Sequence, residues 1–452
     1  MLLSYCLLAL QPDLRQAVPE MIGITAVIAS LLVALLFLGD RHRISWSPAT
    51  ILAVAGAVRL LFLFRSPELS DDIFRYLWDG LTLLAGGNPY TAAPAFIHPL
   101  PEALSSLQQL VNHPELVTIY PPAAQLVFAA GALIDGSVFG IKALLVLLDL
   151  GSCALIIRLL ATFRLPPWQA VLYAWQPLPV LETAASGHID TAGIFFFLAT
   201  LCLLAGGKPA ADHSVPLSAG TVPATRFKGF LRPAMAGCAF SCAVLVKLLP
   251  LIFLPGLLLA LQRRRIAFLF GIVGGGTVLL LPFLPDLVNT VGTLRTYAVN
   301  WEFAGFAFRS LRQATGSGES SRALLATLFL GAAAYRYSRL TSEQGRTSLP
   351  GKNAILLAAV QACSEVTCYF LLLTPTLHPW YAVYLTALLP FAAGAARLVF
   401  CWSVLLGYRV LLPYTILGQW REDGLTPALI SLAPLAALLT VTLVRRMAHQ
   451  PD

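Results

Sequence analysis

Charged residues are scarce in this sequence. Of its 452 residues, 12% are Asp, Glu, Lys or Arg and 58% are hydrophobic. The charged fraction is about half of that in soluble globular proteins, which excludes an ordinary soluble domain. The net charge of +8 is small for the length and is divided among short segments, so it indicates membrane topology rather than a nucleic-acid partner.

Cysteine motifs are absent as well. None of the eight cysteines forms a Cys-x-x-Cys pair or neighbours a histidine at the spacing of a zinc site. They are Cys6, Cys153, Cys202, Cys238, Cys242, Cys363, Cys368 and Cys401. Most lie inside apolar runs, where we interpret them as packing groups. A cleavable signal peptide is not evident, because residues 1–10 are apolar but lack a basic start and a clear cleavage site.

Long hydrophobic runs are what the sequence has in abundance. Runs of roughly 17–25 apolar residues are each long enough to cross the hydrocarbon core of a bilayer. They centre on residues 22–39, 48–64, 139–160, 168–184, 189–206, 234–261, 266–284, 321–338, 354–373, 380–396, 399–417 and 426–444. The alternating pattern of a transmembrane β-barrel does not occur. We predict an all-α fold, a polytopic bundle of about 11–13 spans that forms one integral-membrane domain over residues 1–452.

The basic clusters allow two topologies. In the first, residues 234–261 form a hairpin interrupted at Lys247 and Pro250, and residues 120–134 enter the membrane without crossing it. All basic clusters then face the cytoplasm, as the positive-inside rule favours. In the second, 234–261 is one long helix and 120–134 crosses, which places the basic residues of 226–232 outside. We prefer the first.

In the preferred topology three polar segments share the outer face: 65–119, 187–190 and 378–381. The largest, 65–119, is rich in proline and contains an amphipathic stretch at 72–85, which predicts a juxtamembrane helix lying in the interface. Its aromatic residues Phe74, Tyr76 and Trp78 are expected at headgroup level. Residues 207–232, rich in Gly, Pro, Ser and Thr, are expected to form a cytoplasmic loop.

Asp71 and Asp72 form an adjacent acidic pair at the start of that helix. Acids in the first turn of a helix cap it and complement its dipole, which accounts for one acid better than for two. A carboxylate at the membrane surface can instead accept a proton from a reacting hydroxyl group. Two neighbouring carboxylates raise the pKa of one of them, which suits a general base.

Further motifs follow one another along most of residues 65–390. They are Asp72-Ile73-Phe74-Arg75-Tyr76-Leu77-Trp78-Asp79-Gly80, Gly87-Asn88-Pro89-Tyr90, Tyr120-Pro121-Pro122 with Gln125 and Phe128, Gln176-Pro177 with Glu182 and Gly187-His188-Ile189-Asp190, Lys247 with Pro250, and His378-Pro379-Trp380-Tyr381. This ordered set resembles the GT-C glycosyltransferases, and among them the bacterial integral-membrane mannosyltransferases that use polyprenyl-phosphate sugars. Ile189 stands where Asn or Asp is common in that family.

The resemblance implies a GT-C-like helical fold whose large first outer loop, 65–119, carries the essential acid. That acid aligns with Asp72, and Asp71 is a neighbour that could share its role. The implied reaction moves a hexose, with mannose favoured, from a polyprenyl-phosphate donor to a lipid, glycan or protein acceptor. The implied location is the outer face of the bacterial inner (plasma) membrane, so the expected partners are the donor, the acceptor and membrane lipids.

The departing phosphate of such a reaction needs cationic or hydrogen-bonding partners. Lys247 is the first candidate, because a lysine inside an apolar run normally has a partner. Snorkelling, or pairing with Glu365 or Asp149, is the structural alternative. Arg75, Arg409 and His378 are further candidates, although Arg75 could simply pair with Asp71 or Asp79.

Other polar and aromatic residues of the motifs are candidates for substrate binding: Glu182, His188, Asp190, Asn88, Tyr90, Tyr120, Trp380 and Tyr381. Each has a structural alternative, as a turn former, a helix cap or a member of an interfacial aromatic belt. One histidine and scattered carboxylates do not have the spacing of a metal motif. We therefore assign no cofactor or metal, and leave a divalent cation open.

Two other function classes remain. A transporter or flippase of a lipid-linked or polar substrate would carry charged residues near the middle of several spans and an internal repeat. Lys247, Glu365 and Asp149 fit the first criterion, but no repeat is visible. A scaffold subunit would not need the acidic pair. Among enzymes, a polysaccharide ligase or polymerase would concentrate its polar loop in the C-terminal half.

Overall fold

The computed structural model describes residues 1–39, 44–98, 102–205, 222–340 and 352–447. These residues form helices joined by turns, and β-type pairing among them is confined to isolated bridges of Phe303 and Ala304 with Thr376. The helices are α1 (Leu2–Ala9), α2 (Val18–Leu38), α3 (Pro48–Leu63), α4 (Asp72–Leu84), α5 (Glu102–Leu110), α6 (Pro122–Ile134), α7 (Val138–Thr162), α8 (Val171–Ala174), α9 (Pro177–Pro179), α10 (Asp190–Ala205), α11 (Val222–Val246), α12 (Leu254–Leu261), α13 (Arg265–Leu280), α14 (Asn289–Asn300), α15 (Phe306–Thr315), α16 (Gly318–Ser338), α18 (Lys352–Leu373), α19 (Val383–Leu388), α20 (Ala395–Ser403), α21 (Leu411–Leu417) and α22 (Leu425–Met447). The predicted all-α fold is confirmed.

Membrane-spanning segments account for much of the bundle. Seven helical segments of the described residues are long and apolar enough to cross a membrane: Val18–Leu38, Val138–Thr162, Gly229–Val246, Leu249–Phe283, Asn353–Leu373, Ala395–Leu417 and Leu425–Leu443. Shorter apolar helices, Pro48–Leu63, Pro122–Ile134 and Asp190–Ala205, accompany them. Leucine, valine and phenylalanine side chains on the outer faces of α13 and α22 are exposed, as lipid-facing residues would be. The protein is a polytopic integral membrane protein.

Two predicted spans, 168–184 and 380–396, are broken into short turns. The first passes through α8, α9 and the π-helical turn Val180–Ala185, and the second through the turn Pro379–Ala382 and α19. Prolines at 177, 179 and 390 prevent longer helices. Residues 170–194 are all buried, which fits the rule that irregular backbone at membrane depth must be covered by protein.

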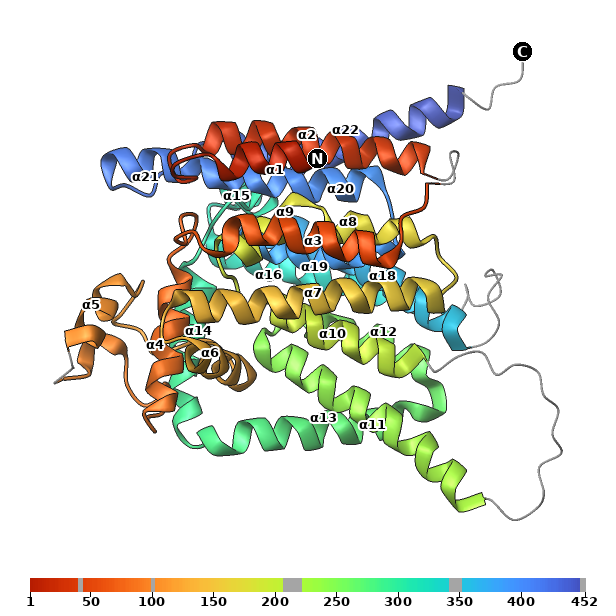
Figure 1. Cartoon of the computed structure of the whole chain (residues 1–452), viewed down its shortest axis with the longest axis horizontal. Coiled ribbons are helices and arrows are strands. Elements are labelled where there is room, and N and C mark those ends of the chain that lie inside the picture. The colour runs from red at the N-terminus through yellow and green to blue at the C-terminus, as the bar shows by residue number, and fades with distance from the viewer. Residues whose placement is uncertain (40–43, 99–101, 206–221, 341–351, 448–452) are drawn as a thin grey trace.

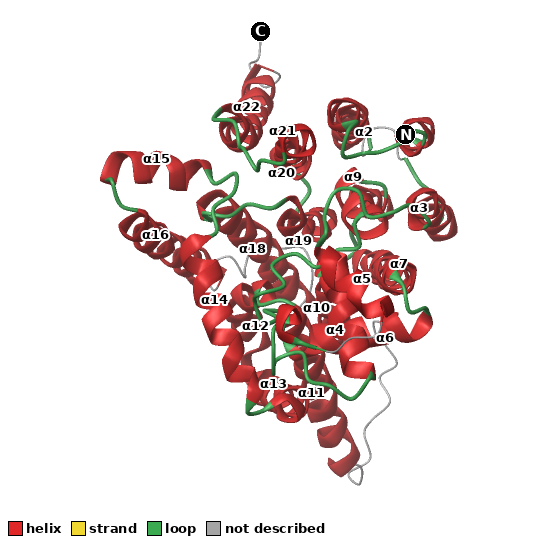
Figure 2. Ribbon diagram, turned by 90° about the vertical axis from the view of Figure 1, so that its left-hand side faces the viewer, coloured by secondary structure: helices red, strands yellow, loops and turns green. Residues whose placement is uncertain are grey.

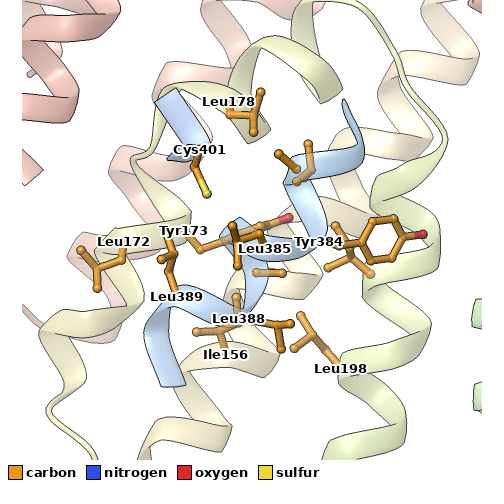
Figure 3. Close-up of a cluster of buried hydrophobic side chains, with 14 of the residues drawn as sticks. Ile156, Leu172, Tyr173, Leu178, Leu198, Tyr384, Leu385, Leu388, Leu389 and Cys401 are labelled. Atoms are coloured by element: carbon orange, nitrogen blue, oxygen red, sulfur yellow. The ribbon is translucent and has the colours of Figure 1, made fainter. Parts of the chain in front are cut away.

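These two broken segments pack against each other in the core. Leu172, Tyr173 and Leu178 of the first lie close to Leu385 and Leu389 of the second (Figure 3). Viewed from the side in Figure 2, α19 lies near the middle of the molecule, whereas α2, α3, α16 and α22 lie at its periphery. The core therefore holds the irregular segments, and long helices surround them.

Residues 234–261 form the hairpin of the first predicted topology. Cys238 Sγ donates to the Gly271 carbonyl at 3.3 Å, and Ser241 Oγ donates to the Ile272 carbonyl at 2.7 Å, so α11 and α13 run parallel. Since α12 connects the end of α11 to the start of α13, it runs back along them. The turn between α11 and α12 contains Lys247. Residues 222–232 belong to α11, so the predicted 207–232 loop is shorter; its residues 207–221 lie outside the described residues.

Helix α6 starts and ends at one end of the bundle. Its 13 residues span about 20 Å, less than the roughly 30 Å of a bilayer core. A three-residue turn leads from α6 into α7, where Lys142 Nζ donates to the carbonyls of Phe62 and Arg65 at the end of α3. Helix α6 is therefore shorter than a typical span, which is compatible with the preferred topology, in which residues 120–134 do not cross.

Helix α4 confirms the predicted amphipathic stretch and lies at the same end of the bundle as α5 and α14, at the left of Figure 1. The Tyr76 ring stacks on Phe128 of α6 with centroids 4.5 Å apart. Gly80 allows the close approach of the two helices, because a Cβ atom there would lie 2.5 Å from the Phe128 carbonyl oxygen. Tyr76 and Trp78 are buried inside the protein and so do not face lipid headgroups, whereas Phe74 is half-buried; their expected depth at headgroup level stays a prediction.

Candidate active site

The structure distinguishes the two acids of the adjacent pair. Asp71 forms an ion pair with Arg15, whose Nη2 lies 2.8 Å from Asp71 Oδ1. Asp72 accepts a hydrogen bond from Asn112 Nδ2 at 2.7 Å, and the Tyr120 hydroxyl lies 3.5 Å from its other oxygen. Among the described residues, no basic side chain lies within ion-pair distance of Asp72. Asp72 is therefore the acid whose charge is not already neutralised.

Lys247 lies at the bend that ends α11 and is paired with an acid from the predicted 187–190 segment. Its Nζ atom lies 2.7 Å from both carboxylate oxygens of Asp190, the first residue of α10. The side chain of Lys247 is 21% exposed, whereas that of Asp190 is 1% exposed. Nζ also lies 4.5 Å from the centre of the Tyr381 ring, a cation–π contact. The buried carboxylate thus holds in place the ammonium group of a side chain that is partly exposed.

Glu182 and His188 are more deeply buried than Lys247. The π-helical turn carries Glu182, and the chain then reverses at Gly187, whose φ of +75° favours glycine. His188 Nδ1 lies 2.7 Å from Glu182 Oε2, and both side chains are buried. The Tyr408 hydroxyl donates to the Glu182 carboxylate at 2.8 Å. The His188 ring thus lies between the Glu182 carboxylate and the Trp380 ring, and neither of its nitrogens makes a hydrogen bond to the described residues.

A column of stacked rings connects His188 to the 378–381 segment. The His188 and Trp380 centroids are 4.1 Å apart, those of Trp380 and His378 4.3 Å, and those of His378 and Phe303 4.8 Å. Burial, with the nearby Lys247 cation, lowers the pKa of His378 to about 3. His378 is therefore neutral at physiological pH and can donate or accept a hydrogen bond without adding charge.

The Asp72 and Lys247 sides meet through tyrosines. The Tyr297 and Tyr381 hydroxyls are 2.5 Å apart. Burial raises the pKa of Tyr297 to about 12, and the charges of Asp72 and Asp190 both add to this increase, so Tyr297 lies within electrostatic reach of both acids. We define the polar cluster as Asp72, Tyr120, Asp190, Lys247, Tyr297 and Tyr381. It combines an unneutralised carboxylate, an accessible cation and several hydroxyl groups at one end of the bundle.

Two predicted substrate-binding residues, Asn88 and Tyr90, support the cluster instead of lining it. Asn88 Nδ2 donates to Asp286 Oδ2 at 2.8 Å, and the buried Tyr90 hydroxyl donates to the Tyr120 carbonyl at 2.6 Å. Asn289 Nδ2, on α14, donates to the Tyr90 carbonyl at 3.0 Å. These bonds fasten α14 to the 65–119 segment.

Sequence reasoning missed the segment 285–320, which contributes Tyr297. The sequence did contain a signal for this segment, because residues 285–320 are a stretch of mixed polarity between the apolar runs 266–284 and 321–338. Asn112, which holds Asp72, was missed for a different reason: it lies 40 residues further along the chain in a segment without a motif.

Two predicted phosphate-binding arginines have other partners. Arg75 Nε lies 3.0 Å from Asp79 Oδ1, and its Nη2 donates to the Leu116 carbonyl. Burial raises the pKa of Asp79, and the Arg75 charge opposes that increase. Arg409 Nη2 lies 3.2 Å from Asp423 Oδ2. Lys247 is thus the basic residue that the described structure brings into the polar cluster.

A divalent cation finds no ready donor set here. Among the residues that the structure describes, no three His, Cys, Asp or Glu side chains are grouped as a metal would require. Both oxygens of Asp190 contact Lys247, and Glu182 contacts His188 and Tyr408. The carboxylates of the site are engaged with protein groups, and we derive no step through a metal.

Comparison with known proteins identifies one family. The family model of Glycosyltransferase family 87 matches residues 118–363, more than half of the chain. Comparisons with curated proteins and with solved structures return no match. The matched range includes Tyr120, Asp190 and Lys247, whereas Asp72 and the 378–381 segment lie outside it.

Proposed function

The chain belongs to glycosyltransferase family 87, and from this premise we propose that it moves a hexose, with mannose favoured, from a polyprenyl-phosphate donor to a hydroxyl group of a lipid, glycan or protein acceptor. A glycosyltransferase embedded in the membrane can reach a donor whose lipid chain lies in the same bilayer. The proposal includes a GT-C mechanism and fold.

The active site is proposed to face outward from a bacterial inner membrane. Arg263 and Arg264 precede α13 and Arg265 begins it, at the end of the bundle opposite to Lys247, because α11 and α13 run parallel and Lys247 follows the end of α11. Under the positive-inside rule the arginine-rich end is cytoplasmic. The polar cluster then lies on the outer side.

Asp72 is proposed as the general base. The observation that carries this role is that Asp72 has no cationic partner among the described residues, although Asp71 and Asp79 each have one. An acceptor hydroxyl hydrogen-bonded to Asp72 gives its proton to the carboxylate as its oxygen attacks the anomeric carbon of the donor. The bond between that carbon and the phosphate oxygen breaks, and polyprenyl phosphate leaves with the electron pair.

Lys247 is proposed to bind the departing phosphate. The leaving group gains negative charge as the bond breaks, and a preorganised ammonium group stabilises that charge. Lys247 is suited to this because Asp190 and the Tyr381 ring already position its Nζ atom. His378 and Trp380, in the ring column nearby, are proposed to border the donor on the same side.

A transporter is less well supported. Its buried charges would have to line a path, but Arg59 is buried in an ion pair with Asp149, and Arg336 lies 2.6 Å from Glu365. Arg59 also donates to the carbonyls of Ala55 and Ala174. These charges are paired with acids inside the protein, and the family is one of transferases.

The test is transfer of radiolabelled mannose from polyprenyl-phosphate mannose by the purified protein in lipid nanodiscs. We expect Asp72→Asn to lower the turnover by at least about 100-fold, because general base catalysis contributes that much. The matched variant Asp71→Asn removes the neighbouring charge and should stay within a few-fold of wild type. Full activity of Asp72→Asn would contradict the assignment of the base. No turnover with any polyprenyl-phosphate hexose would contradict the proposed reaction.

A further inference from the structure

Three aromatic side chains in mutual contact extend outward from the polar cluster, to which Tyr297 belongs, and we call His113, Trp301 and Tyr297 the aromatic strip. The His113 and Trp301 rings meet edge to face with centroids 4.9 Å apart, and the Trp301 and Tyr297 rings stack with centroids 5.3 Å apart. The strip joins two segments that are distant in sequence, 65–119 and 285–320. None of its residues has a role in the proposed reaction so far.

The two ends of the strip adjoin the two ends of the proposed reaction. At one end the Tyr297 hydroxyl contacts Tyr381, whose ring lies under Lys247. At the other end His113 directly follows Asn112, the side chain that holds Asp72. An attacking hydroxyl and a leaving phosphate lie on opposite sides of the anomeric carbon in an in-line displacement. With the phosphate at Lys247 and the hydroxyl at Asp72, the rest of the acceptor lies on the Asp72 side, where His113 follows Asn112 and contacts Trp301.

The chemistry of the strip suits a sugar ring. One face of a pyranose presents C–H groups that pack on the flat surface of an aromatic ring, while its hydroxyl groups bond to polar neighbours. Trp301 is half-buried, and the side chains of His113 and its neighbour Glu115 are 53% and 56% exposed. His113 and Trp301 lie between helices and Tyr297 lies on α14, all outside the candidate membrane spans, where a hydrated sugar has access and a lipid tail does not.

Backbone strain marks the same place. His113 has φ of +48°, a left-handed conformation that is uncommon for residues other than glycine. Such conformations persist where the surroundings hold them, and they concentrate at binding sites. Resting on the proposed function, we propose that the aromatic strip binds the pyranose ring of the acceptor, so that the acceptor is a glycoside rather than a simple alcohol or a protein hydroxyl.

The experiment uses the full chain in nanodiscs and methyl α-D-mannopyranoside as the probe, with binding followed by saturation-transfer NMR. We expect the wild type to bind the pyranoside and not mannitol, which has hydroxyl groups but no ring. Trp301→Ala should weaken binding about three- to tenfold, as expected for loss of one aromatic contact, and Trp301→Phe should restore most of it. His113→Asn, which tolerates the left-handed backbone, should weaken binding without disturbing the fold.

A matched control and a kinetic measurement complete the test. Phe96 is an aromatic residue of the same 65–119 segment, 72% exposed and outside the strip, so Phe96→Ala should bind like wild type. In the transfer assay, Trp301→Ala should raise the KM for the pyranoside and leave the KM for the donor unchanged. The proposal that the strip binds the acceptor is overturned if the pyranoside binds equally well to Trp301→Ala, His113→Asn and Phe96→Ala. This holds even if Asp72→Asn abolishes transfer.

The binding result is independent of turnover. If wild type binds the pyranoside through Trp301 but transfers no sugar, the proposed reaction fails and the strip stands. A second arm presents the same mannoside on a dialkyl lipid within the nanodisc. Transfer to the soluble pyranoside alone identifies a free glycan as the acceptor, and transfer to the lipid-borne sugar alone identifies a glycolipid headgroup.

Discussion

Replacing Lys247 by methionine removes the cation that faces the buried Asp190 carboxylate. Removing one partner of a buried ion pair costs about 3–5 kcal/mol, because the other charge is left without compensation. The side chain of Lys247 is 21% exposed, so water can partly replace it, and we expect about 3 kcal/mol of destabilisation for Lys247→Met. The double variant Lys247→Met/Asp190→Asn removes both charges and should recover most of this loss.

The same pair of variants separates the structural role of Lys247 from its proposed catalytic role. Thermal inactivation in nanodiscs should rank wild type and the double variant above Lys247→Met. Sugar transfer should fall about 100-fold or more in both variants, because neither has a cation for the departing phosphate. Recovery of transfer together with stability in the double variant would refute the phosphate-binding role and leave Lys247 as the counter-ion of Asp190.

Four other variants test how the chain holds the site and its core. In Gly187→Ala a Cβ atom would lie 2.4 Å from Ile73 Cδ1 at a φ of +75°, so we expect about 1–3 kcal/mol of destabilisation by thermal unfolding; an unchanged melting temperature would contradict this packing. His378 has a pKa lowered from 6.5 to about 3 in the folded state, so the unfolded state binds an extra proton between these values and stability should decline as pH falls through this window. His378→Gln should show a smaller decline in melting temperature between about pH 7 and pH 4, and a slope equal to that of wild type would count against the burial of a neutral ring. Arg59→Met should destabilise by about 3–5 kcal/mol and Arg59→Met/Asp149→Leu by less, measured by thermal unfolding, and equal losses would mean that the pair is not coupled.

The hydrophobic periodicity of the sequence predicted helices whose formation depends on neighbouring residues in the chain. The amphipathic pattern at 72–85 predicts a helix, and α4 is observed at Asp72–Leu84, because its apolar residues recur on one face. The same pattern could not say whether Tyr76 and Trp78 face lipid headgroups or protein. Both are buried, and Tyr76 stacks on Phe128 of α6, which packs on α4. Apolar composition likewise predicted crossings at 168–184 and 380–396, but proline and burial decide that these segments are broken turns.

The candidate site was predicted only in part, because some of its residues stand out locally in the sequence and others do not. Position at a span end and unusual polarity mark Asp72, Asp190 and Lys247 in the sequence, and the structure brings all three to one end of the bundle. It pairs Lys247 with Asp190 and Asp71 with Arg15, 56 residues away in the chain. Such pairings depend on which helix ends meet, and no local pattern records them. Tyr297 and Asn112 were missed because their importance comes from their neighbours.

The sequence by itself determined that this protein is an integral membrane protein with a helical-bundle fold. Burying unpaired peptide groups in hydrocarbon is costly, so long apolar runs that cross a membrane form helices. Its family membership is also carried by sequence, in residues 118–363. Only the tertiary structure decided which of two adjacent acids is neutralised, which cation remains accessible, and that α14 reaches across to the 65–119 segment. These outcomes depend on distances between residues far apart in the chain, and charge interactions change within a few ångströms.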